Sequence, residues 1–168
     1  MSLTMHQASV PAFQRTLRAL SVILDKADAH AAASKIEPSV LLSARLFPDM
    51  FALAKQVQLT CDFAKNGVAR LSGVDAPKFE DKEASFPDLK ARITATLGFI
   101  ESLKGGQVDG TEEKRITLTI AGTERHFSGR DYLLYFVLPN FYFHATTAYD
   151  ILRHNGVALG KRDYMGIN

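Results

Sequence analysis

The sequence contains a single cysteine, Cys61, and lacks the short motifs that commonly mark an enzyme. One cysteine can form neither an internal disulfide nor a cysteine-based zinc site. There is no GxGxxG, no HExxH and no paired-cysteine motif, so the usual signals for dinucleotide binding and for zinc hydrolases are absent. The stretch "GVALGK" is one residue shorter than a phosphate loop and lacks the Ser or Thr that should follow. Any function must therefore be sought in the spacing of polar residues along the predicted helices.

The chain also lacks a long apolar run and a surplus of charge. No segment approaches the ~20 apolar residues of a membrane span, and the first residues contain no apolar stretch typical of a signal peptide. The formal net charge is +2, with basic and acidic residues interleaved, so no basic stripe for nucleic acid is present. We expect a cytoplasmic protein that binds neither membrane nor nucleic acid. The 168 residues, of which 46% are hydrophobic, predict a single domain over residues 1–168.

Apolar residues recur at spacings of three and four, which predicts long amphipathic helices. The predicted helices span residues 3–33, 48–71, 87–103 and 128–154. Ser128 is the expected N-cap of the last helix, with Asp131 in the capping-box position. Residues 156–168 are expected to form an extended tail.

Two segments between these helices determine the predicted topology. The polar connection from Ser72 to Pro87 could reach ~50 Å when extended, whereas a 20-residue helix is ~30 Å long. It can therefore cross the bundle and let the third helix run parallel to the second. Before the last helix, "RITLTIAGTERHFSG" alternates apolar and polar residues and predicts a β-hairpin lying on the bundle. The predicted fold is an all-α four-helix bundle, ordered up-down-down-up, with a long crossover and a small hairpin.

The last helix carries two polar residues on its apolar face. Asn140 and His144 are four residues apart, so they share one side of the helix with Val137 and Ala148. Each must form hydrogen bonds or cost roughly 1–3 kcal/mol. Pro139 is expected to kink the helix beside them, because it removes one backbone hydrogen bond.

The second helix offers partners for these two residues. Asp49 and Gln56 are seven residues apart and fall close together on a helix. A cluster of Asp49, Gln56, Asn140 and His144 on facing helices has two interpretations. It is a buried polar network that fixes helix register, or it is a working site.

The last helix is also apolar on nearly every side, with the aromatic residues Tyr135 and Phe143 outside the main stripe. A helix that is hydrophobic all round is buried all round. The hairpin can cover one flank. We expect a second copy of the chain to cover another, which predicts a homodimer through the last helix.

Two segments carry a resemblance to a known family. They are "RLFPDMFALAKQVQLTCDFAK" and "PNFYFHATTAYDILRHNGVALGKRDYMG". They resemble an uncharacterised family known only as a domain of unknown function, and the order of helices, crossover and hairpin resembles the DinB/YfiT-like superfamily. The resemblance covers nearly the whole chain and implies the same bundle.

The resemblance also implies where a metal would lie. Metal-binding relatives have one histidine on the second helix and two histidines four residues apart on the fourth. Here His144 matches the last of these and Asn140 the one before it. No histidine occurs between His30 and His126, and Asp49 is the nearest substitute. One histidine, one asparagine and one aspartate are a poor set of ligands for zinc or nickel. We expect no cofactor, although Asp49, Asn140 and His144 would suit a weakly held Mg²⁺ or Ca²⁺ better than Zn²⁺.

Three functions therefore stay open. The first is a bundle whose degenerate metal site is a polar network or a weak pocket for a small ligand. The second, implied by the resemblance, is a metal-dependent enzyme, a transferase or hydrolase using a thiol cofactor, with Asp49, Asn140 and His144 in its site. The third is a non-catalytic interaction protein that acts through its dimer surface.

Overall fold

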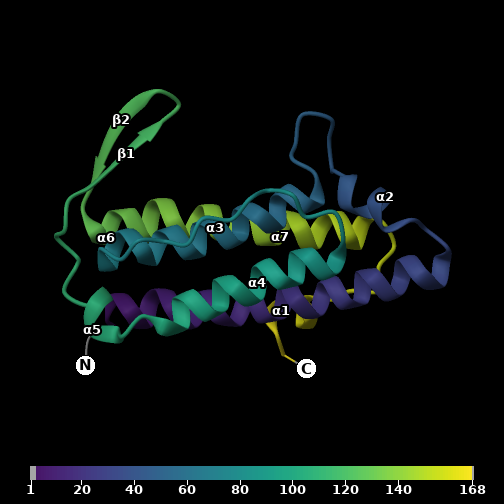
Figure 1. Ribbon diagram of the computed structural model, residues 1–168, viewed down its shortest axis with the longest axis horizontal. Coiled ribbons are helices and arrows are strands. Elements are labelled where there is room, and N and C mark those ends of the chain that lie inside the picture. Colours follow the sequence, from purple (N-terminus) through teal and green to yellow (C-terminus); the bar gives the residue numbers. More distant parts are fainter. Residues whose placement is uncertain (1–2, 168) are drawn as a thin grey trace.

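The computed structural model describes residues 3–167, and long helices form most of it (Figure 1). The long segments are α1 (Met5–Ser34), α3 (Leu53–Ser72), α4 (Phe86–Ser102) and a last segment made of α6 (Gly129–Asp131), η1 (Tyr132–Val137) and α7 (Leu138–His154). Shorter helices are α2 (Pro38–Ser43), α5 (Gly105–Val108) and α8 (Lys161–Met165). The strands β1 (Ile116–Ile120) and β2 (Thr123–Phe127) pair antiparallel. The prediction of a mainly helical fold with a small hairpin is confirmed.

The core lies between two pairs of helices. In Figure 1, α3 and α7 form one row and α1 and α4 the other, and each row packs against the opposite one. Phe13 of α1 meets Phe141 of α7 edge-to-face, with ring centroids 4.7 Å apart. Both rings are fully buried, as are Val57 and Cys61 of α3. The apolar stripes that predict the helices thus meet at the centre of the bundle, where burial provides the main stabilisation.

The crossover between α3 and α4 runs back along the bundle, so the two helices begin near the same end (Figure 1). Two ion pairs tie early parts of both helices together. Lys55, in the first turn of α3, pairs with Asp81 just before α4. Arg92, early in α4, pairs with Asp62 in the first half of α3. The two helices therefore run in the same direction, and the crossover lies along both.

Side-chain caps explain where several helices begin. Thr4 caps α1 and forms a capping box with Gln7. Ser85 Oγ accepts from the backbone of Asp88 at the start of α4. Ser128 Oγ accepts from the backbone of Asp131, so the predicted cap of the last helical segment is confirmed. Each cap satisfies a backbone N–H that has no partner within its helix.

The last helical segment is interrupted by a π-helix just before Pro139. In η1 the backbone N–H of Leu138 donates to the carbonyl of Leu133, five residues back. Pro139 follows directly and has no N–H to donate, so the widened turn falls next to the position where α-helical bonding is broken. Val137 of η1 packs against α3 at Gly67, where an added Cβ would lie 2.6 Å from Val137 Cγ1. The wide turn and the glycine together bring the two helices into close contact.

Two predictions about these segments are wrong. Helix α3 begins at Leu53, not at Pro48, so Asp49 lies in the loop before it. The tail is not wholly extended, because it forms α8, which packs on α1. There Lys26 of α1 pairs with Asp163 and Arg15 donates to the carbonyl of Met165, contacts that sequence periodicity cannot reveal.

The hairpin is predicted to lie on the bundle through its isoleucine and leucine face. It contacts the core through Ile116, which is buried, and through Leu118 and Phe127, but its turn end projects from the bundle beside α6 (Figure 1). Within residues 3–167, none of the helices combines the length and the apolar character needed to cross a membrane.

Candidate functional site

A buried hydrogen bond joins the two facing helices α3 and α7. His144 Nδ1 lies 2.7 Å from Gln56 Oε1, and the two residues are 8% and 1% exposed. The amide of Gln56 is held by a second bond, because its Nε2 donates to the carbonyl of Phe51 at 3.1 Å. That bond leaves Gln56 Oε1 as the acceptor, so His144 must donate from Nδ1. The neutral imidazole therefore carries its lone pair on Nε2.

The Nε2 atom of His144 is the free end of this pair. Within residues 3–167 this nitrogen makes no hydrogen bond, and it is not fully buried. It therefore keeps some contact with solvent. One imidazole nitrogen is fixed inside the bundle while the other is available at its surface.

Aromatic rings surround the imidazole on both helices. The ring of Phe63 from α3 stacks on His144, with centroids 5.5 Å apart and an interplanar angle of 17°. Phe143 meets it edge-on at 5.3 Å. Beyond Phe63, Phe136 and Phe127 extend the contacts to the base of the hairpin at 5.8 and 5.6 Å. A row of aromatic rings therefore runs along the interface between α3 and α7, with His144 near one end.

Burial lowers the pKa of His144 below its ordinary value of 6.5, because the surroundings disfavour the imidazolium ion. Because the pKa of His144 is lower in the folded state than in the unfolded state, its neutral form contributes stability at pH values above the unfolded pKa. That contribution is lost as the pH falls through the folded-state pKa. The wild-type protein should thus lose more stability than His144→Gln between about pH 7 and about pH 5, where an ordinary histidine titrates. Chemical unfolding at a series of pH values checks this. Parallel pH profiles for the two proteins would contradict it.

The other two members of the predicted cluster lie elsewhere. Asn140 is half-buried, and its Nδ2 donates to the carbonyl of Phe136, one turn back on its own helical segment, at 2.7 Å. Asp49 is exposed in the loop before α3. The structure thus brings Gln56 and His144 together, whereas Asn140 turns to its own backbone and Asp49 stays outside.

This donor set does not fit a zinc or nickel ion. A catalytic zinc site uses three protein ligands, and here His144 Nε2 is the single unoccupied nitrogen of the cluster. Within residues 3–167, no group of three or more His, Cys, Asp or Glu side chains is arranged to hold a metal ion. Cys61 does not help, because burial raises its pKa to about 12 and keeps it a thiol. Where the family resemblance implied a metal ligand, His144 instead forms a hydrogen-bonded amide–imidazole pair with Gln56.

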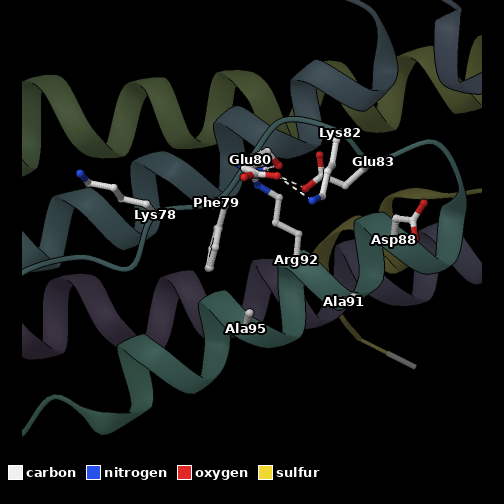
Figure 2. A pocket seen from close by; sticks show the side chains of 9 residues that line it. All are labelled: Lys78, Phe79, Glu80, Lys82, Glu83, Asp88, Ala91, Arg92 and Ala95. Atoms are coloured by element: carbon white, nitrogen blue, oxygen red, sulfur yellow. Dashed lines mark hydrogen bonds and ion pairs between the residues drawn. The ribbon is translucent and has the colours of Figure 1, made fainter.

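A second polar cluster, missed from the sequence, surrounds Arg92 of α4 (Figure 2). Arg92 is 5% exposed and pairs with Glu83 at 2.8 Å, Asp81 at 2.9 Å and Asp62 at 3.0 Å. Its Nε is the described side-chain atom that is buried without a partner. The guanidinium therefore joins α4 to both the crossover and α3.

The same cluster includes an aromatic residue of the crossover. Phe79 lies near two cations, with Lys65 Nζ 4.2 Å and Arg92 Cζ 5.3 Å from its ring centroid. Glu83 also accepts from Gln58 of α3 at 2.7 Å. Charged and aromatic contacts together hold the crossover against the bundle.

A cavity of about 600 Å³ lies beside this cluster. Figure 2 shows its lining, in which three cationic side chains are balanced by three carboxylates: Lys78, Lys82, Arg92, Glu80, Glu83 and Asp88. Such a lining attracts neither an anion nor a cation strongly. Arg92 already forms ion pairs with carboxylates, so the cluster holds the crossover against α3 and α4.

Fold and site together place the chain in a class of known proteins. A crystal structure of a DinB family member protein from Shewanella denitrificans superposes with a TM-score of 0.87 and 40% sequence identity, over 96% of this chain and 91% of that one. The protein is thus a DinB-like helical bundle. The model of the family described as "Domain of unknown function (DUF1993)" matches residues 5–165, and the chain belongs to that family. The family resemblance inferred from the sequence is confirmed. No curated protein matches the chain.

Proposed function

We propose that this protein is a small-molecule binding protein of the DinB-like type, in which Gln56 and His144 form the polar part of the binding site. The observation that supports this most is the 2.7 Å bond between His144 Nδ1 and Gln56 Oε1. It fixes the tautomer that directs the Nε2 lone pair outward. A partly accessible imidazole between the rings of Phe63 and Phe143 would suit a flat, apolar ligand that has one hydrogen-bond donor.

A metal-dependent transferase or hydrolase has less support. That function would need Asp49, Asn140 and His144 to converge on one ion, but Asp49 is exposed and Asn140 is bonded to Phe136. His144 alone could act as a general base, yet within residues 3–167 no nucleophile or second acid hydrogen-bonds to it. Binding without catalysis is the function that the pair supports best.

The test uses phenol, which has an aromatic ring and one donor, against anisole, which lacks the donor. We expect phenol to shift the nitrogen NMR signal of His144 Nε2 while Nδ1 stays protonated, and anisole to leave Nε2 little changed. Gln56→Ala should remove the preference for the Nδ1–H tautomer, because the acceptor is gone. An Nε2–H tautomer in the wild-type protein would contradict the proposed site.

A second set of variants tests whether a metal has a role. His144→Ala should lower the free energy of unfolding by roughly 1–3 kcal/mol, since Gln56 loses its partner, and a chelator should not change this loss. The exposed His154→Ala is the matched control, with an effect below about 1 kcal/mol. Stoichiometric zinc or nickel in purified protein, lost in His144→Ala, would overturn the proposal and favour the metalloenzyme.

Self-association is a second candidate function, supported by exposed aromatic residues on the last helical segment. Tyr135 is 74% and Phe143 is 57% exposed. Large aromatic side chains are enriched in interfaces. We propose that the protein forms a homodimer and that this segment contributes to the contact.

A further inference from the structure

The hairpin has a regular geometry that fixes which backbone groups face outward. Ile120 pairs with Thr123 across a two-residue turn, in which Ala121 and Gly122 have φ values of 48° and 77°. Such a turn is flanked by a hydrogen-bonded pair, and the pairs then alternate along the ladder. The backbone groups of Thr117 and Thr119 in β1 therefore point away from β2, as do those of Glu124 and His126 in β2.

These outward groups lie on open edges. The hairpin projects from the bundle (Figure 1), and the side chains of Thr117 and Thr119 are exposed. An isolated two-stranded hairpin is marginally stable in water, and an open edge is a template for another strand. Natural sheets protect their edges with charged residues. Strand β2 has Glu124, Arg125 and His126, whereas β1 has no charged residue at all.

The sequence of β1 is the same in both directions: Ile-Thr-Leu-Thr-Ile. If two copies pair antiparallel about a twofold axis at Leu118, leucine lies opposite leucine, threonine opposite threonine and isoleucine opposite isoleucine. In this register Thr117 faces Thr119 of the second copy. These are the residues whose backbone groups point outward, so both threonines exchange their N–H and C=O bonds with the other chain. Matched threonine and aliphatic pairs also stabilise neighbouring strands.

We propose that two copies of this chain associate by antiparallel pairing of their β1 strands about a twofold axis at Leu118, forming a four-stranded sheet. The inference rests on the self-association proposed above, and it assigns the main contact to β1 rather than to the last helical segment. Pairing through β2 is disfavoured, because the same symmetry would place Arg125 opposite Arg125 of the second copy. An uncharged strand that is complementary to itself favours a second copy over an unrelated partner.

Proline variants test the edge without breaking the hairpin. Thr117→Pro removes an N–H that faces outward, a position at which an edge strand tolerates proline. We expect light scattering to show a dimer for the wild-type protein at tens of micromolar and a monomer for Thr117→Pro. Thr117→Val keeps the N–H and should remain dimeric. His126→Pro blocks the open edge of β2 in the same way and should also remain dimeric.

A cysteine at the proposed axis gives an independent measurement. In the paired sheet Leu118 would face its copy across a pair with a Cα separation of about 4.5 Å, which a disulfide can span. Leu118→Cys should become a covalent dimer under mild oxidation, whereas Arg125→Cys on β2 should not. Cys61 should not interfere, because it is buried.

The outcomes distinguish the proposed β1 interface from self-association through another surface. A monomeric wild-type protein overturns both. A dimer that survives Thr117→Pro but is lost in Tyr135→Ser overturns the β1 interface and leaves a dimer through the last helical segment. Loss of the dimer in Thr117→Pro together with specific crosslinking of Leu118→Cys supports the proposal.

Discussion

Replacing Arg92 with methionine should unfold this protein more readily than any other single change to a charged residue described above. The side chain of Arg92 is 2% exposed, and its removal leaves the carboxylates of Glu83 and Asp62 in a partly buried place without their main cation. Breaking a buried ion pair by removing one partner costs about 3–5 kcal/mol. Because Asp62 and Asp81 keep contact with water, we expect a loss near the lower end, about 3 kcal/mol.

Chemical unfolding measures this loss, and limited proteolysis locates it. Cleavage in Arg92→Met should begin in the crossover between α3 and α4, since that segment loses its clamp. Lys82→Ala is the control: Lys82 pairs with Glu80 at the surface, where both side chains are largely exposed, and its loss should cost less than about 1 kcal/mol. Equal effects of the two changes would show that the Arg92 cluster contributes no more than a surface pair.

The effect of Arg92 should also depend on pH. Burial opposes the ionisation of Glu83, but hydrogen bonds from Arg92, from its own backbone and from Gln58 outweigh burial and hold its pKa below the ordinary 4.5. A lowered folded pKa gives stability that is present above the unfolded pKa and lost as pH falls through the folded value. The wild-type protein and Arg92→Met should therefore become more alike in stability as pH falls below 4.5.

The signal for the Arg92 cluster was present in the sequence. Arg92 falls between Leu89 and Thr96 at spacings of three and four, so a cation interrupts the apolar stripe of α4. A charge at such a position needs a partner. The acidic residues of the crossover supply it, but the crossover has no periodicity that would align it with α4. The stripe therefore predicts a buried charge, while its partners emerge only when the fold is complete.

The candidate site was predicted in part for a similar reason. Spacing alone places His144 inward, and the structure joins it to Gln56. The helix predicted over residues 48–71 includes Asp49, yet α3 begins five residues after position 48, at Leu53. Asn140 shares the stripe with His144, but its short side chain reaches the carbonyl of Phe136 first. Side chains of this kind often bond to their own backbone, and periodicity carries no information about that choice.

The π-helix before α7 shows a limit of the same kind. Pro139 predicts a missing backbone bond and a kink. The structure shows that the preceding turn is widened, so Leu138 bonds to Leu133. Val137 of that turn packs closely against Gly67 of α3. The proline thus marks the place of the irregularity, whereas its π-helical form is not encoded by the proline alone.

Gly129 is the second position at which one small change should have a large effect. An added Cβ would lie 1.9 Å from the carbonyl oxygen of Thr111 and 3.3 Å from Leu71 Cδ2. The nearer contact is with backbone, which cannot rotate away as a side chain can. The next residue, Arg130, donates its N–H to the carbonyl of Glu112 at 2.9 Å, so the two segments are bonded at this crossing. Gly129→Ala should therefore force them apart and cost about 3 kcal/mol.

Gly98→Ala is the matched control for Gly129→Ala and should have the opposite sign. Gly98 lies inside α4, and a Cβ there would meet nothing within 4 Å. Alanine restricts the unfolded chain and favours helix, so this change should stabilise the protein by roughly 0.5–1 kcal/mol. Chemical unfolding of both variants, with the wild-type protein alongside, measures the difference. If Gly129→Ala costs less than about 1 kcal/mol, the backbone at Thr111 can move aside and the crossing is not close-packed in solution.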